Sequence, residues 1–489
     1  MTSKELFIRA FPEDPTISRS LPDFLVAGLE CDSRNVEKNF IFVAVRGAKQ
    51  DGALFSAEAA SRGARVIVTE SRETQAPGFG ATVVLVEDSR LAVSRLAAAY
   101  FGNPSEALQA VGVTGTNGKT TSAYLLEHLL GAQGSKTGVI GTISTRYGGK
   151  EIPAQETTPG PLKIQRILSE MARASCECVV MEVSSHALDQ KRTEGISFAS
   201  ALFTNLTQDH LDYHGTLENY FEAKAKLFLR LRPENFSILN ADDVWNARLK
   251  ERLASRVLTY GIENAADFRA ENIRWEGAST HFDLHRDGRV FKAVSPLVGF
   301  HNVYNALGAL AVMESLGFSL EKTVPTLAAF RGVPGRLEKV DLGQDFSVLI
   351  DFAHTPDGLE NVLGSLLPYK KGKLILVFGC GGDRDRGKRP KMGAIAGRLC
   401  DQVYVTSDNP RSEDPREIAR QICEGFAEPF KNFIVVTDRH KAVRQALMAA
   451  RKGDIVLLAG KGHEKTQVLK DRVLPFSDRE EAEKVLSGR

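Results

Sequence analysis

Residues 110–134, AVGVTGTNGKTTSAYLLEHLLGAQG, contain a short apolar run, a glycine-containing loop and a helical pattern. The run predicts a strand over residues 110–114. The helix that follows has an apolar stripe formed by Leu125, Leu126, Leu129 and Leu130. The loop between them consists of Gly115, Thr116, Asn117, Gly118, Lys119, Thr120 and Thr121. A loop in this context is typical of a phosphate-binding site.

Each part of this loop has a chemical reason to bind nucleotide phosphates. Glycines let the backbone approach the ligand, and the N–H groups at the helix N-terminus face the anion. The Lys119 ammonium can neutralise phosphate charge, and the Thr120 hydroxyl can bind Mg²⁺. The strict motif has glycine where this chain has Val113, so an ordinary glycine turn before a helix is the alternative.

The composition sets limits on the rest of the chain. Its 489 residues suggest about three domains, and its 43% hydrophobic and 25% charged residues are ordinary for a globular protein. The net charge of +2 gives no bulk attraction for nucleic acid or for an anionic membrane, so we expect neither partner. Six scattered cysteines predict no disulfide framework. With no long apolar run and no signal-peptide core, we expect a cytoplasmic protein.

The chain divides into three α/β blocks, over residues 1–108, 109–336 and 337–489. In the first, the strand candidates are NFIFVAVRG, GARVIVTE and ATVVLVED. The second carries the phosphate loop, the strand candidates CVVMEVSS and SFASALFTNL, and a helical stretch from residue 301; we expect a mostly parallel sheet like that of P-loop ATPases. In the third, SVLIDF, KLILVFG, QVYVTSD, NFIVVTD and DIVLLAG alternate with helical stretches near 357–367, 391–400, 415–427 and 440–450. That alternation predicts a Rossmann-like, doubly wound parallel sheet.

Two further residues follow strand candidates of the second block. Glu182 ends the run CVVMEV, and an unpaired carboxylate at the tip of a buried strand is costly, so Mg²⁺ near the phosphates is an economical partner. A buried ion pair is the alternative. His210, in TQDHLDYHG, also follows a strand candidate and is either a metal or phosphate ligand or a structural histidine.

A lysine interrupts the apolar face of the next helix. Leu217, Tyr220, Phe221, Leu227 and Phe228 mark that face, and Lys224 lies in its middle. Partial desolvation lowers the pKa of a lysine, and a neutral amine can react with CO₂ to form a carbamate able to hold a second Mg²⁺. The alternative is a lysine that snorkels to the helix edge, which the pattern alone favours.

Many motifs in order resemble those of the Mur ligase family, in particular members that add meso-diaminopimelate. They run from Asp32–Arg34 to Glu464 and include TGTNGKTT, EVSSHAL, NLTQDHLDYHG with AKAKLF, HNVYNALGA, PGRLE, DFAHTPDGL, FGCGGDRDRGKRP, SDNPRSEDP and AGKGHE. The resemblance implies an ATP-dependent amide ligase that adds the diamino acid to UDP-N-acetylmuramoyl-L-alanyl-D-glutamate through an acyl phosphate. That reaction belongs to peptidoglycan precursor synthesis, and so to cell wall biogenesis, cell shape and cell division.

The resemblance also implies a role for each block. The first is expected to bind the UDP-sugar, the second ATP and the third the amino acid, in a monomer that closes around small-molecule substrates. Lys119, Lys224, Glu182 and His210 would be catalytic, with Thr120, Glu182, His210 and carbamylated Lys224 as ligands of two Mg²⁺ ions. ATP would further contact Asn302, Asn305, Arg336, Asp351 and His354.

The remaining implied contacts concern the other two substrates. The UDP-sugar and its peptide would contact Ser33, Arg34, Thr157, Thr158, Ser184, Gln190 and Arg192. The chain departs from the family where Gly160 replaces a common aspartate and Lys191 a common histidine. Diaminopimelate would contact Arg384, Asp408, Asn409, Pro410, Arg411, Gly460 and Glu464. Arg386 and Arg389 remain alternatives to Arg384.

The run SDNPR discriminates between amino acids. Diaminopimelate carries a distal carboxylate that Arg411 can bind in bidentate fashion, whereas lysine has none and would leave Arg411 unpaired. An Asx-Pro turn with a surface arginine is the alternative. At the level of function, the alternatives are a lysine-adding ligase, a folylpolyglutamate synthetase-like ligase and a non-catalytic nucleotide-binding protein.

Overall fold

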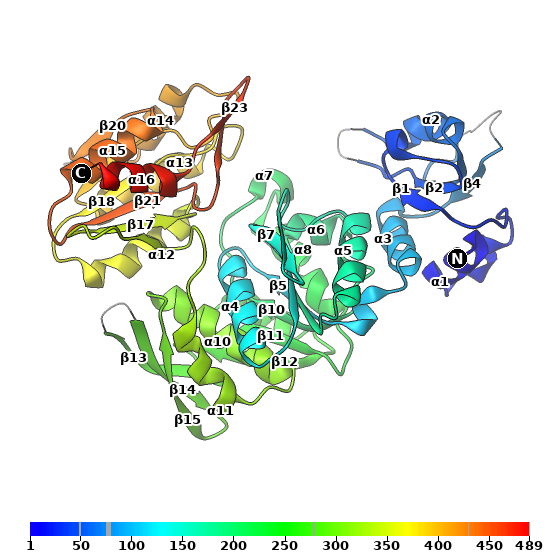
Figure 1. Ribbon diagram of the computed structural model, residues 1–489, viewed down its shortest axis with the longest axis horizontal. Coiled ribbons are helices and arrows are strands. Elements are labelled where there is room, and N and C mark those ends of the chain that lie inside the picture. Colours follow the sequence, from blue (N-terminus) through cyan, green and yellow to red (C-terminus); the bar gives the residue numbers. More distant parts are fainter. Residues whose placement is uncertain (48–49, 75–79, 277–278, 429, 489) are drawn as a thin grey trace.

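The computed structural model describes residues 1–489 except 48–49, 75–79, 277–278, 429 and 489. Three α/β bodies follow one another along the molecule, with the N-terminus in one end body and the C-terminus in the other (Figure 1). Their sheets span residues 28–85, 109–295 and 338–459. Within the described residues, no helix combines the length and apolar character needed to cross a bilayer.

The N-terminal body is a four-stranded parallel sheet in the order β1-β2-β3-β4. Its strands are β1 (Gly28–Glu30), β2 (Phe40–Val43), β3 (Ala64–Thr69) and β4 (Thr82–Leu85), and its helices are α1 (Ser3–Ala10), α2 (Ser56–Ser61) and α3 (Ser89–Tyr100). The three predicted strands of this block are confirmed, and β1 is added. Asp88 caps α3 by accepting from the N–H of Leu91, and α3 packs on the middle body.

The middle body is built on an eleven-stranded sheet. Its order is β15-β14-β13-β12-β11-β10-β5-β9-β6-β7-β8. The strands are β5 (Gln109–Thr114), β6 (Thr137–Ile140), β7 (Ser144–Tyr147), β8 (Lys150–Pro153), β9 (Cys178–Glu182), β10 (Phe198–Phe203), β11 (Phe236–Asn240), β12 (Arg256–Gly261), β13 (Phe268–Glu276), β14 (Ser279–Arg286) and β15 (Arg289–Ser295). The centre, from β13 to β6, is parallel, and antiparallel pairings add β14 and β15 at one end and β7 and β8 at the other.

Helices cover this middle sheet. They are α4 (Lys119–Ala132), α5 (Pro161–Arg173), α6 (Ser185–Asp189), α7 (Leu211–His214), α8 (Leu217–Leu229), α9 (Val244–Lys250), α10 (Phe300–Ser315) and α11 (Leu320–Thr323). The predicted leucine stripe of α4 is confirmed, since all four side chains are fully buried in a core shared with α10. The strand β5 and the helix α4 therefore flank the phosphate loop as the sequence predicts.

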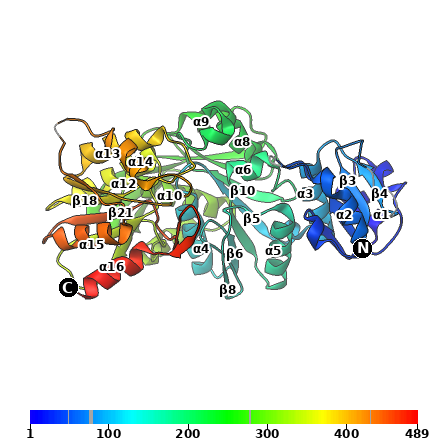
Figure 2. The same cartoon turned by 90° about the horizontal axis from the view of Figure 1, so that it is seen from above.

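The C-terminal body is a six-stranded sheet in the order β16-β17-β21-β18-β19-β20. Its strands are β16 (Glu338–Val340), β17 (Ser347–Asp351), β18 (Leu374–Phe378), β19 (Gln402–Val405), β20 (Phe433–Val435) and β21 (Ile455–Ala459). The five predicted strands are parallel to one another, and β16 adds an antiparallel edge. The helices are α12 (Pro356–Leu366), α13 (Lys388–Leu399), α14 (Pro415–Cys423), α15 (Arg439–Ala449) and α16 (Asp478–Ser487), and β22 (Thr466–Val468) pairs with β23 (Val473–Pro475). Figure 2 shows this body beside the middle one, with the N-terminal body at the far end.

Candidate active site

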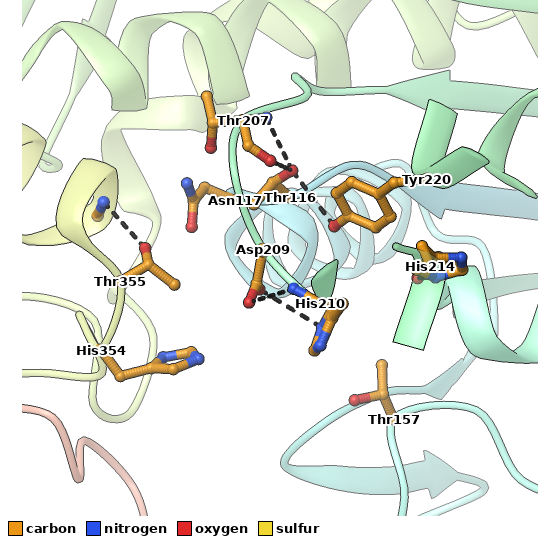
Figure 3. Close-up of polar contacts among 12 residues, drawn as sticks. Thr116, Asn117, Thr157, Thr207, Asp209, His210, His214, Tyr220, His354 and Thr355 are labelled. Carbon is orange, nitrogen blue, oxygen red and sulfur yellow. Dashed lines mark hydrogen bonds and ion pairs between the residues drawn. The ribbon is translucent and has the colours of Figure 1, made fainter. Parts of the chain in front are cut away.

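A cavity of about 560 Å³ lies between the middle and C-terminal bodies. Most of the residues proposed for ATP line it, namely Thr116, Asn117, Gly118, Lys119, Thr120, Thr121, Asn302, Asn305, Arg336, Asp351 and His354. His210, Lys224, Thr157 and Ser184 line the same cavity. Residues far apart in the sequence therefore converge on one space, part of which Figure 3 shows.

The phosphate loop has the backbone conformation that its glycines allow. Gly118, which immediately precedes α4, has a φ of 87°, and a Cβ added there would lie 2.4 Å from Oδ1 of Asn305. Asn305 in turn donates to Oδ1 of Asn302 at 3.0 Å, so the two predicted asparagines lie against the loop. Only glycine fits this close approach without displacing Asn305.

The Lys119 ammonium lies inside the loop. It donates to the carbonyl oxygens of Gly115 and Thr116 at 2.8 and 2.9 Å. Burial lowers the pKa of Lys119 below its usual value, while the Glu182 carboxylate opposes that change. A cation held in this way is positioned for the phosphates of a nucleotide.

Glu182 ends β9 and is buried, with 1% of its surface exposed. Its carboxylate accepts from Oγ1 of Thr120 at 2.9 Å and from the N–H and Oγ1 of Thr142, both at 2.9 Å. In the described part of the chain, no lysine, arginine or histidine nitrogen lies within 4 Å of this carboxylate. A buried anion with only neutral donors, beside a threonine hydroxyl, is a donor set of hard oxygens that suits Mg²⁺.

Lys224 lies in the apolar face of α8, as its position in the sequence suggests, and it does not snorkel. It is 1% exposed, its Nζ donates to Gly115 O at 2.9 Å, and the ammonium lies 4.4 Å from the centre of the Tyr220 ring. Burial and the neighbouring Lys119 lower the pKa of Lys224 well below its usual value. The lowered pKa therefore favours the neutral, nucleophilic form of the amine.

His210 belongs to a group of aromatic and acidic side chains at the cavity edge (Figure 3). Its Nε2 lies 3.4 Å from Oδ2 of Asp209, and its ring contacts those of His186 and Tyr220. Desolvation lowers the pKa of His210 to about 4, which keeps the imidazole neutral at physiological pH. Among the described residues, no three histidine, cysteine, aspartate or glutamate side chains form a ready metal-binding group. The proposed metal ligands thus line one region without forming an all-protein cage.

The C-terminal body forms the opposite wall of the cavity. Nη2 of Arg336 lies 3.4 Å from Oγ1 of Thr120, and the guanidinium stacks over Phe352. Burial raises the pKa of Asp351, which accepts from the N–H groups of Leu337 and Ala353. His354 is at the same wall, and burial lowers its pKa.

Asp357, which sequence reasoning did not single out, joins the two bodies directly. It lies in the first turn of α12 and accepts from Nδ2 of Asn117 at 2.6 Å and from Oγ1 of Thr207 at 3.2 Å. In the sequence, only its place in the motif DFAHTPDGL distinguished Asp357 from other aspartates. Thr142 and Asp209 were also missed, since neither residue type nor spacing distinguishes them before the strands are placed in space.

The residues proposed for the UDP-sugar form two separate groups. Thr158 accepts from the N–H of Ser184 at 3.0 Å and donates to Glu182 O, and the hydroxyls of Thr157 and Thr142 are 3.1 Å apart. Arg192 donates to Thr158 O and to Oε1 of Gln190, which completes the first group.

The second group lies in the N-terminal body. Ser33 donates to Glu58 at 2.7 Å, and the largely exposed Arg34 pairs with Asp32. The substituted Lys191 connects the two bodies, because its Nζ contacts Asp88 at 2.6 Å. Gly160 is the N-cap residue of α5 and, because it has no side chain, it provides no side-chain hydrogen bond to the start of that helix.

The residues proposed for the amino acid are held together at the ends of β19 and β21. Asn409 donates to Oε2 of Glu464 at 2.9 Å, and Nη1 of Arg411 donates to Gly382 O at 2.8 Å. Gly460 has a φ of 108°, and a Cβ there would lie 2.8 Å from Oδ2 of Asp408. Pro410 lies between Asn409 and Arg411 and packs its carbonyl against Gly382.

The three candidate arginines differ in their surroundings. Arg389 is fully buried and forms an ion pair with Glu413 at 2.9 Å, and Arg386 lies 3.3 Å from the same carboxylate. Burial lowers the pKa of the Arg411 guanidinium, and the charge of the nearby Arg384 lowers it further. Arg384 itself is exposed. Arg384 therefore lies beside Arg411, whereas Arg386, which is also largely exposed, lies against Glu413.

Family models match all three bodies. The model of the Mur ligase family, catalytic domain, matches residues 25–101, that of the Mur ligase middle domain matches 113–313, and that of the Mur ligase, glutamate ligase domain, matches 335–462. These matches follow the same order as the three sheets.

Individual proteins match almost the whole chain. A UDP-N-acetylmuramoyl-L-alanyl-D-glutamate--2,6-diaminopimelate ligase of Thermosynechococcus vestitus is 45% identical, and the match covers 98% of this chain and 95% of that protein. A ligase of the same name from Caldanaerobacter subterraneus is 42% identical, and the match covers 95% of this chain and 96% of that protein. A solved structure of a ligase of that name is 33% identical and covers 95% of both chains with a TM-score of 0.68. A folylpolyglutamate synthase of Mycobacterium tuberculosis in complex with ADP and AMPPCP, at 20% identity and a TM-score of 0.65, covers 81% of this chain and 95% of its own and shares the fold.

Proposed function

The chain belongs to the Mur ligase family, and from that premise we propose that it is the ATP-dependent ligase that joins meso-2,6-diaminopimelate to UDP-N-acetylmuramoyl-L-alanyl-D-glutamate. The observation that carries this proposal is the near full-length match to ligases named for this reaction. The folylpolyglutamate synthase covers a smaller share of the chain, which disfavours that alternative. A cytoplasmic monomer that serves cell wall synthesis, and with it cell shape and division, fits this function.

The reaction needs activation of a carboxylate. A free carboxylate oxygen of the nucleotide dipeptide attacks the γ-phosphorus of ATP, ADP leaves, and an acyl phosphate forms. The neutral amine of diaminopimelate then attacks the acyl carbon, and loss of phosphate and a proton leaves an amide. The protein contributes by positioning the reactants and by stabilising charge as it moves toward the leaving groups.

The residues of the cavity are suited to the first step. Lys119 and the N–H groups of the phosphate loop would hold the β- and γ-phosphates, with Arg336 approaching from the connection to the C-terminal body. Asn302, Asn305, Asp351 and His354 would surround the rest of the nucleotide. Because Asp357 binds Asn117 of the loop, closure of the C-terminal body and nucleotide binding are expected to influence each other.

The site also suits Mg²⁺. Thr120 and Glu182 would hold one ion, and His210 with a modified Lys224 would hold a second. When bound, Mg²⁺ neutralises phosphate charge and so assists transfer of the phosphoryl group. The buried Glu182 carboxylate, which accepts only neutral donors, supports this assignment.

We further propose that Lys224 is N6-carboxylysine in the active enzyme. Its neutral amine would attack CO₂, form an N–C bond and release a proton. The product is an anion, so it would remove the unfavourable proximity of two ammonium groups at Gly115 O and supply oxygen ligands. The lowered pKa of the unmodified amine supports this reaction.

The other two substrates are assigned to groups of residues that lie mostly outside this cavity. Ser33 and Arg34 would bind the uridine diphosphate, and the peptide would extend over Thr157, Thr158, Ser184, Gln190 and Arg192. Arg411 would bind the distal carboxylate of diaminopimelate and Arg384 the other one. Asp408, Asn409, Gly460 O and Glu464 would bind the distal ammonium.

The mechanism is tested with a nucleotide dipeptide labelled with ¹⁸O in the glutamate carboxylate that becomes the new amide. Mass spectrometry should show one ¹⁸O in the released phosphate and a product heavier by one diaminopimelate residue. Phosphate without the label would contradict the acyl phosphate.

A further inference from the structure

Lys461 is fully buried in the C-terminal body, and its ammonium lies among the three side chains proposed to receive the distal ammonium of the amino acid. Its Nζ contacts Oε2 of Glu464 at 2.8 Å, Oδ1 of Asn409 at 3.1 Å and Oδ1 of Asp408 at 3.7 Å. A buried ammonium is costly unless anions and acceptors surround it. The lysine and the three acceptors therefore depend on one another.

The turn that carries Lys461 is fixed against the nucleotide cavity. It follows β21, and its His463 ring lies 5.3 Å from the ring of Phe352, a residue of the cavity wall. A Cβ added to Gly335 would lie 2.2 Å from the N–H nitrogen of His463, so the turn is in close contact with the connection between the two bodies. Residues 460–464 thus join the nucleotide cavity to the amino-acid motif.

A second element holds the motif from the other side. In the hairpin β22–β23, the N–H of Val468 donates to Oδ1 of Asn409 at 2.9 Å, and Gln467 donates to Asp408 O at 2.7 Å. Oδ1 of Asn409 thus accepts from both Val468 and Lys461, which directs its Nδ2 toward Glu464. Lys461 therefore helps to set the orientation of both Asn409 and Glu464.

Among Asp408, Glu464, Arg411 and Lys461 the charges balance only when Lys461 is counted, since the nearby buried Arg439 is already paired with Asp478. Asp408 and Glu464 contribute two negative charges, and Lys461 and Arg411 contribute two positive ones. The distal end of diaminopimelate is a neutral pair of ammonium and carboxylate, whereas the distal end of lysine is a single cation. A balanced pocket suits the former, and an excess of negative charge suits the latter.

Resting on the function proposed above, we propose that Lys461 is a specificity-determining positioning residue. Its ammonium orients Asp408, Asn409 and Glu464 and offsets one of their charges, so that the pocket accepts a zwitterionic head group in preference to a bare ammonium. It acts through these three residues rather than on the reacting atoms.

The test compares kcat/KM for diaminopimelate and for lysine in Lys461→Met, which removes the charge and leaves an unbranched side chain one atom shorter. The KM for diaminopimelate should rise at least tenfold, the KM for ATP should stay within about twofold, and the preference for diaminopimelate over lysine should fall at least tenfold. An equal loss for both amino acids would reduce Lys461 to a structural role and overturn the proposal. Lys370→Met, which breaks an ion pair with Asp401 elsewhere in this body, is the control and should leave the preference unchanged.

A second variant should change the preference for diaminopimelate over lysine in the opposite direction. Glu464→Gln keeps Lys461 but leaves the pocket with excess positive charge, so both amino acids should bind less well and lysine should lose more. A preference that is unchanged or lowered would contradict charge matching, and this result stands even where Lys461→Met does not fold. Wild-type turnover is measured first: its absence with diaminopimelate contradicts the proposed function, whereas normal turnover with unshifted preferences contradicts only the role of Lys461.

Discussion

Lys119 and Lys224 donate to the same acceptor, the carbonyl oxygen of Gly115, at 2.8 and 2.9 Å. One lysine comes from the start of α4 and the other from the middle of α8, so this contact depends on the packing of both helices. Two ammonium groups at one carbonyl repel each other, and the buried Lys224 has its pKa lowered well below normal. Burial beside Lys119 therefore favours the neutral form of the Lys224 amine.

Lys224→Ala should reduce turnover to background, because no carbamate can form. A short carboxylic acid such as acetate should restore part of the activity by placing a carboxylate in the vacated space. The measurement is phosphate release with and without the acid. Lys226→Ala, two residues along α8 and paired with Asp189 at the surface, is the matched control and should retain activity. Full activity of Lys224→Ala without acid would contradict the assignment.

Arg411→Lys should raise the KM for diaminopimelate at least tenfold, because a lysine cannot form the bidentate contact that a guanidinium makes with a carboxylate. The KM for ATP should not change. Steady-state kinetics with each substrate varied in turn provide the measurement. Arg420→Lys, at an exposed position of α14, is the control. An unchanged KM for diaminopimelate would remove Arg411 from the amino-acid site.

Glu182→Gln should increase the Mg²⁺ concentration needed for half-maximal turnover by about tenfold or more, since a buried carboxylate is replaced by a neutral amide. Titration of Mg²⁺ into EDTA-treated enzyme tests this, with ATP binding followed separately by calorimetry. The N–H of Thr142 can still donate to the amide oxygen, and the hydroxyls of Thr142 and Thr120 can turn to accept from the amide NH₂, so the fold should persist. An unaltered Mg²⁺ requirement would show that Glu182 has only a structural role.

Acid should destabilise the protein through His214. Burial, with a contribution from His186, lowers the pKa of His214 to about 4, against about 6.5 in the unfolded chain. The unfolded state therefore binds a proton that the folded state does not, and stability falls as the pH drops from 6.5 to 4, by at most about 1.4 kcal/mol per pH unit. Urea unfolding over this range should show a weaker pH dependence for His214→Asn. Equal slopes for both proteins would contradict the buried neutral state.

The sequence predicted best those features that depend on the residues of a single strand or helix. The five strands of the C-terminal sheet are continuous apolar runs, and Lys224 stands out against the aromatic residues around it. The hairpins β13–β15 were not predicted, because strands with one exposed face, such as β15, contain many charged residues. Lys461 and Asp357 were missed for a different reason: their roles depend on partners from other elements, and no local pattern reveals which strand ends meet.

The central claim is that the chain adds diaminopimelate to the nucleotide dipeptide. The most direct measurement is phosphate release from ATP in the presence of UDP-N-acetylmuramoyl-L-alanyl-D-glutamate, with either meso-diaminopimelate or lysine as the acceptor. We predict rapid release with diaminopimelate, at a kcat/KM at least a hundredfold above that with lysine. Equal rates with the two amino acids, or release with lysine alone, would contradict the account.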